Sequence, residues 1–130
     1  MTNEELALVN RLTACKRWRL IPGIVARDKN NAVFVFVGYH TDGQEMWAGP
    51  SGWLAGSALT IDITSPATLG CLLTLIREAW NDPGLYTVPL SSPGSVVNYL
   101  WHIRGNGSYI AKRSYTTEIA ALVAALEVAP

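Results

Sequence analysis

A helix from Pro66 to Trp80 is the feature of the sequence that most constrains the fold. Pro66 stands where its missing backbone N–H costs nothing, and Ser65 before it can accept a hydrogen bond from the first turn. Large apolar residues follow at the offsets of one helical stripe: Leu69, Leu72, Leu73, Ile76 and Trp80. The run Asn81-Asp82-Pro83-Gly84 ends the helix. Such a stripe has to be buried, so the chain needs a packed core.

Two further helices are predicted, one at each end of the sequence. Thr2 or Asn3 caps the first, whose apolar side carries Leu6, Val9 and Leu12. Thr116 or Thr117 caps the last, whose apolar stripe, separated by alanines, is Ile119, Leu122, Val123 and Leu126.

Strands are predicted between the helices. The Val- and Phe-rich run Ala32 to Tyr39 is typical of a strand with both faces largely buried. The others are Gln44 to Ala48, Ala58 to Ile63, Leu85 to Val88, and a hairpin from Val96 to Arg113 that reverses at Gly105-Asn106-Gly107. This order predicts an α+β fold: an antiparallel sheet of about five to six strands with two or three helices packed on one face.

Composition bounds the class of protein. The 130 residues suit a single domain over residues 1–130, and ten basic side chains balance ten acidic ones. The N-terminus lacks a basic region followed by an apolar run, and no stretch is long enough to span a bilayer. We therefore expect a cytoplasmic protein that does not bind membranes, in which Cys15 and Cys71 are reduced.

Two strings in the sequence resemble those of a family of small uncharacterised proteins encoded by phages and prophages. They are Pro66-Ala67-Thr68-Leu69-Gly70-Cys71-Leu72-Leu73 and, near the C-terminus, Ala121-Leu122-Val123-Ala124-Ala125-Leu126-Glu127. Ser65 departs from the family, which has an Asp there, but both residues cap helices well. The resemblance implies a phage gene product made in a bacterial cytoplasm. It implies no activity, cofactor or site residue.

Catalytic and metal-binding patterns are missing from the sequence. Gly49-Pro50-Ser51-Gly52 lacks the spacing of a nucleophile elbow, and the cysteines and histidines are spread singly rather than in ligand pairs. We therefore predict a protein without enzymatic activity, cofactor or metal. The least favoured alternative is an enzyme with a site around His40, Asp42 or His102.

A Trp-rich region is the first candidate for a contact surface. Trp47 and Trp53 bracket a Gly-rich stretch from Gly49 to Gly56, expected to be an irregular loop, and His40 lies in the preceding hairpin. The alternative is that the tryptophans plug the end of the sheet.

A basic segment is the second candidate. Residues 11–29 hold six of the ten basic residues and only one acidic residue, Asp28. Arg17, Trp18 and Arg19 stand together there, so phosphates could contact the arginines while a base stacks on the indole. The alternative is a solvated face with Trp18 in the core.

The sequence thus favours a small accessory protein that binds a host or phage macromolecule without catalysis, most readily a protein. A nucleic-acid-binding module using residues 11–29 is the alternative. Self-association is also open, because the strand Ala32 to Tyr39 and the alanine-rich last helix could be buried internally or across a two-fold axis.

Overall fold

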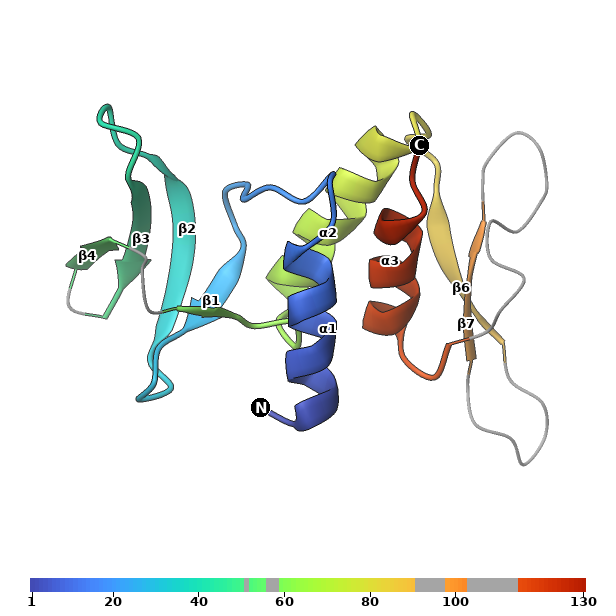
Figure 1. Cartoon of the computed structure of the whole chain (residues 1–130), viewed down its shortest axis with the longest axis horizontal. Helices are drawn as coiled ribbons and strands as arrows, with labels where there is room; N and C mark the ends of the chain where they lie inside the picture. Colours follow the sequence, from blue (N-terminus) through green and yellow to red (C-terminus); the bar gives the residue numbers. More distant parts are fainter. Residues whose placement is uncertain (51, 56–58, 91–97, 103–114) are drawn as a thin grey trace. The chain divides into compact units, whose positions relative to one another are not determined.

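The computed structural model describes residues 1–50, 52–55, 59–90, 98–102 and 115–130 (Figure 1). This part of the chain contains three helices and seven strands, which confirms the α+β class. It divides into two compact units, Arg19–Cys71 and Met1–Trp18 together with Leu72–Pro130. The single domain over residues 1–130 stays a prediction.

The unit Arg19–Cys71 is built on a five-stranded antiparallel sheet, which confirms the predicted kind of sheet. Its spatial order is β4-β3-β2-β1-β5. The strands are β1 (Val25–Arg27), β2 (Val33–Tyr39), β3 (Glu45–Gly49), β4 (Gly52–Ala55) and β5 (Thr60–Ile61).

Strand β2 differs from its prediction, because only one of its faces is buried. Phe34 and Phe36 are 6% and 1% exposed, whereas Val33, Val35 and Val37 are 41%, 36% and 40% exposed. Successive side chains of a strand point to opposite faces, and an antiparallel sheet commonly packs a core against one face only. The continuous apolar run therefore supplies both a core face and a solvent face.

The core face of β2 is aromatic. The rings of Phe36 and Trp47 meet edge to face with centroids 5.2 Å apart. Phe34 lies against the backbone of Gly49, where a Cβ would come within 2.2 Å of the ring, so this position needs glycine. A register shift between Phe36 and Gly38 sets Tyr39 opposite Glu45, on the same side of the sheet as Phe36. The rings of Tyr39 and Phe36 have centroids 5.2 Å apart, but Tyr39 is 59% exposed.

The helix α2 (Pro66–Ala79) confirms the main sequence prediction, although its buried face is rotated. Leu72, Leu75 and Ile76 are fully buried, whereas the predicted Leu69, Leu73 and Trp80 are half-buried. Thr68 is also buried, because its hydroxyl accepts a hydrogen bond from the Val25 N–H at 3.0 Å. This polar contact extends the buried stripe one turn toward the helix start.

The second unit contains α1 (Asn3–Thr13), residues of α2 from Leu72 onward, β6 (Tyr86–Leu90), β7 (Asn98–His102) and α3 (Glu118–Glu127). Strands β6 and β7 form a separate antiparallel pair. The predicted reversal at Gly105-Asn106-Gly107 lies outside the described residues. Helix α3 contacts α1 on one side and the two strands on the other (Figure 1).

Both terminal helices are capped as predicted. Thr2 and Glu5 form a capping box on α1, and the Thr117 hydroxyl accepts from the Ala120 N–H on α3. Of the predicted α1 stripe, Val9 and Leu12 are buried but Leu6 is 46% exposed. Leu6 lies in the first half of this helix, where the core covers less of its surface.

Helix α3 is enclosed on all sides. Every residue from Ala121 to Leu126 is buried, including the alanines between the predicted stripe positions. The Trp80 indole N–H donates to the Ala125 carbonyl at 3.0 Å, which adds a polar contact to this apolar core. In the described part of the chain, no helix is long and apolar enough to cross a membrane.

Candidate functional site

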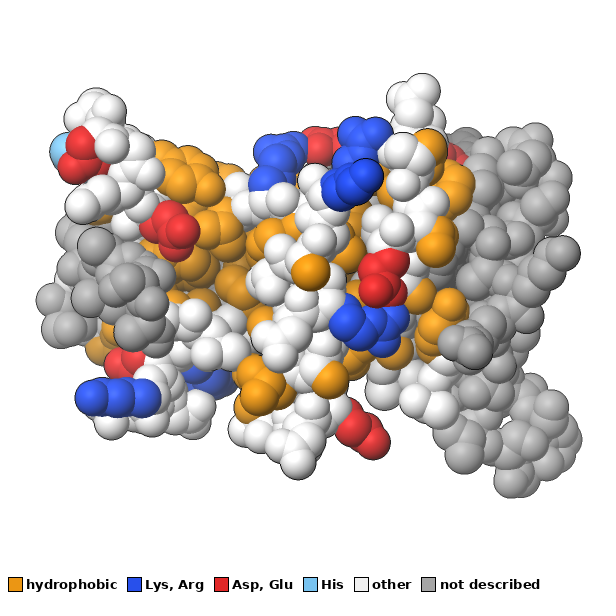
Figure 2. Space-filling view, in the orientation of Figure 1, with side chains coloured by type: hydrophobic (Ala, Val, Ile, Leu, Met, Phe, Trp, Pro, Cys, Tyr) orange, Lys and Arg blue, Asp and Glu red, His pale blue; other side chains and the backbone are white. Residues whose placement is uncertain are grey.

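The exposed side of β2 forms the first candidate surface, here called the valine face. It consists of Val33, Val35 and Val37 with the half-buried Met46 and Ala48 of β3. Ala48 lies opposite Val35, and Met46 lies opposite Gly38, which places both β3 residues on the same side as the valines. Hydrophobic side chains reach the surface of the unit Arg19–Cys71 in the view of Figure 2.

An ion pair stands beside the valine face. Arg27 of β1 lies opposite Val33, and its Nε donates to the Asp62 carboxylate at 2.8 Å. The same carboxylate accepts from the Thr64 N–H at 3.0 Å and hydroxyl at 2.6 Å. Burial alone would raise the pKa of Asp62, but the hydrogen bonds from Thr64 and Arg27 outweigh it and hold the pKa below its usual value. The positive charge of Arg27 is therefore balanced.

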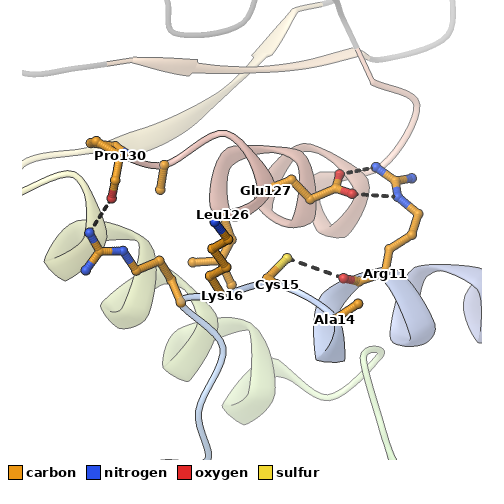
Figure 3. Close-up of a pocket in the computed structure, with 9 residues that line it drawn as sticks. Arg11, Ala14, Cys15, Lys16, Leu126, Glu127 and Pro130 are labelled. Atoms are coloured by element: carbon orange, nitrogen blue, oxygen red, sulfur yellow. Dashed lines mark hydrogen bonds and ion pairs between the residues drawn. The ribbon is translucent and has the colours of Figure 1, made fainter.

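The second candidate surface is a pocket of about 810 Å³ within the other unit, here called the basic groove (Figure 3). It lies where the chain leaves α1 and where α3 ends. Its lining residues are Arg11, Ala14, Cys15, Lys16, Arg17, Leu126, Glu127, Ala129 and Pro130.

Two arginines of the basic groove are held in place by neighbours. The Glu127 carboxylate accepts from the Arg11 Nε at 3.2 Å and from an Arg11 Nη, and this hydrogen-bonded pair raises the pKa of Arg11. An Nη of Arg17 donates to the Pro130 carbonyl. Lys16 stands between them in the sequence and is exposed.

The thiol of Cys15 lines the basic groove and is hydrogen-bonded to the backbone. It donates to the Arg11 carbonyl at 3.3 Å, and burial raises its pKa. A raised pKa keeps the thiol protonated at neutral pH, and a protonated thiol is a poor nucleophile.

The structure places the residues of the predicted Trp-rich surface in different environments. Trp47 is only 2% exposed and its indole N–H donates to Glu45 at 3.1 Å, so it packs in the core instead of forming a contact surface. The stretch Gly49–Gly56, expected to be irregular, begins as a hairpin in which Gly49 pairs with Gly52. Trp53 lies in β4 opposite Ala48, and its side chain is outside the described part.

The other predicted residues are not brought into one site. His40 stands at the exposed β2–β3 turn, its Nδ1 3.2 Å from an Asp42 oxygen. Arg17 lines the basic groove, while Trp18 is half-buried and does not line it. Arg19 is exposed and belongs to the unit Arg19–Cys71. The basic segment of residues 11–29 is thus shared between the two units.

Neither candidate surface resembles a metal centre. Among the described residues, no group of three or more His, Cys, Asp or Glu side chains could hold an ion. His102 lies in β7 opposite Tyr86, and its side chain is outside the described part.

Sequence reasoning missed both surfaces in their actual form. The groove depends on Glu127 meeting Arg11 across 116 positions of chain, and no local pattern signals such a contact. The valine face did carry a signal, because valine and phenylalanine alternate strictly from Val33 to Val37.

Comparison with known proteins adds no assignment. The chain matches no family model, no curated protein and no solved structure.

Proposed function

We propose that this protein acts without catalysis, by binding another protein through the valine face. The observation that carries the proposal is the exposure of Val33, Val35 and Val37, each between 36% and 41%, in a strand whose other face is core. Contiguous exposed apolar side chains bordered by polar ones are typical of protein-interaction surfaces. The phage-family resemblance and the expected bacterial cytoplasm favour a host or phage protein as the partner.

The energy available from the three valines is modest but useful. Complete burial of a valine contributes about 1.5 to 3 kcal/mol, so covering the exposed two-fifths of three valines contributes roughly 2 to 4 kcal/mol. A specific complex needs further contacts, and Met46 and Ala48 extend the apolar surface in the direction of β4.

The charge on this surface favours a protein over a nucleic acid. Phosphate binding depends on an excess of positive charge, and the charge of Arg27 beside the valine face is balanced by Asp62. An apolar protein surface needs no such excess. The exposed His40–Asp42 pair at the hairpin tip is likewise better suited to a rim contact than to a catalytic site.

Nucleic-acid binding through residues 11–29 stays the alternative proposal. The basic groove gathers Arg11, Lys16 and Arg17, which supports it, but Trp18 is not among the lining residues and cannot stack on a base there. Titration with mixed single-stranded DNA and RNA at low and moderate salt tests it, since phosphate contacts weaken steeply as salt rises.

The protein-binding proposal is tested with a charge placed on the valine face. Val37→Lys puts an ammonium group in the apolar contact, and Thr41→Lys adds the same charge at the neighbouring exposed turn as a matched control. Both variants and the parent are used to capture proteins from an extract of phage-infected bacteria. Each captured protein is then purified and titrated by calorimetry, with unfolding curves recorded for both variants.

The expected result is a partner that binds the parent and Thr41→Lys equally and Val37→Lys at least tenfold more weakly, which corresponds to about 1.4 kcal/mol. A partner that binds all three proteins alike would contradict the proposal. Sedimentation velocity covers self-association: a dimer that Val37→Lys dissociates would replace the foreign partner with a second copy of this chain.

A further inference from the structure

The side chains that line the basic groove carry more positive than negative charges. Arg11, Lys16 and Arg17 carry three positive charges and Glu127 one negative charge, which leaves two positive charges among the lining side chains. Helices α1 and α3 both end here, at Thr13 and Glu127, and each helix end acts as roughly half a negative charge. The excess of three cationic side chains over one carboxylate favours an anion in the groove, most directly beside the exposed Lys16.

The two arginines keep donors for a ligand. A guanidinium has five N–H groups; the contacts to Glu127 involve two donor nitrogens of Arg11, and the Pro130 carbonyl engages one of Arg17. These contacts also restrict the two side chains, so less conformational entropy is lost when a ligand binds. Lys16 adds a compact charge of the kind that commonly contacts phosphate.

The remaining walls of the basic groove are apolar. Ala14, Ala129 and Pro130 offer a surface for a flat or apolar body rather than for a bare ion, whereas Leu126, which also lines the groove, is only 2% exposed. The volume of about 810 Å³ falls within the usual range of about 300 to 1,000 Å³ for small-molecule sites.

We propose that the basic groove binds a small organic phosphate monoester, with the phosphate on Lys16 and the two arginines and the body of the ligand against Ala14, Ala129 and Pro130. A nucleoside monophosphate has this chemistry, since it joins a doubly charged phosphate to a flat base. A phosphodiester strand fits less well, because each of its phosphates carries one negative charge where a monoester carries up to two. This site is independent of the valine face, which lies in the other unit.

The test is calorimetric titration of the full chain at low salt with adenosine monophosphate, with adenosine, and with a single-stranded oligonucleotide. Lys16→Glu reverses a charge in the groove. Lys29→Glu makes the same change at an exposed turn in the other unit and is the matched control. Unfolding curves of both variants show that they are folded to the same degree.

The proposal expects adenosine monophosphate to bind at least tenfold more tightly than adenosine, and Lys16→Glu to weaken that binding at least tenfold while Lys29→Glu leaves it within twofold. Equal binding of adenosine and its monophosphate would overturn it, as would an equal loss in both variants or no binding at millimolar ligand. Oligonucleotide binding that Lys16→Glu abolishes, without binding of the monophosphate, would overturn it in favour of nucleic acid.

Discussion

Strand β2 and helix α3 are both largely apolar, and the protein buries them to different extents. All residues of α3 from Ala121 to Leu126 are buried, whereas every second residue of β2 from Val33 to Val37 is exposed. The helix contacts α1 and both strands of the β6–β7 pair. The strand has its aromatic core on one face and the valine face on the other.

The geometry of the two elements explains the difference. Successive helix residues point about 100° apart, so an apolar run of six residues must be covered on all sides or leave apolar surface in water. Successive strand residues point to opposite faces, so a single layer of partners buries half of them. A helix that is apolar all round therefore indicates a core that covers it on all sides. An apolar strand can have one face in a core and its other face exposed as a binding surface.

The largest expected change in the free energy of unfolding is for a substitution in α3. Leu122→Ala should lower the free energy of unfolding by about 2 to 5 kcal/mol, because Leu122 is 1% exposed and its truncation leaves a cavity. Urea denaturation measures the loss. Leu6→Ala in α1 is the matched control, and its loss should stay below about 1 kcal/mol because Leu6 is 46% exposed. Equal losses would mean that α3 is not enclosed as described.

A second test concerns the Asp62 carboxylate, whose hydrogen bonds stabilise the sheet beside the valine face. Asp62→Asn should lower the free energy of unfolding by about 1 to 3 kcal/mol at pH 7, because it weakens charge-assisted hydrogen bonds from Arg27 and Thr64. The pKa of Asp62 is lowered in the folded protein, so the ionised carboxylate stabilises the fold.

The sign of that shift sets the pH dependence. The contribution of Asp62 is fully present above its unfolded-state pKa of about 3.9 and is lost as pH falls through the lower folded-state pKa. Denaturation at pH 7 and at pH 3 should therefore show the parent and Asp62→Asn converging in acid. A difference that stays constant between these pH values would show that the carboxylate charge does not stabilise the sheet.

The smallest expected change in the free energy of unfolding is for a substitution on the valine face. Val37→Thr keeps the β-branched shape and places a hydroxyl in contact with water, so the free energy of unfolding should change by less than about 0.5 kcal/mol. Val123→Thr in α3 buries the same hydroxyl and should cost about 1 to 3 kcal/mol. If Val37→Thr cost as much as Val123→Thr, the valine face would be part of a core and the comparison would fail.

Local features of the fold could be predicted because their causes are local. The Thr2–Glu5 capping box and the Thr117 cap join residues three positions apart, and a short stretch of sequence contains both partners. The α2 stripe was predicted less well, because Leu75 and Thr68 are buried whereas the predicted Leu69 and Leu73 are only half-buried. Which flank of an apolar helix is buried depends on its neighbours and not on the helix alone.

The amino-acid sequence by itself determined the α+β class, the three helices, the caps of α1 and α3, and the apolar segments that have to be buried, because backbone preference and hydrophobic period act over a few residues. Only the tertiary structure decided which face of β2 meets water, that Trp47 belongs to the core, and that Arg11 and Glu127 meet to form one side of the basic groove. Those outcomes depend on contacts between residues far apart in the chain. Both proposed binding surfaces are of this second kind.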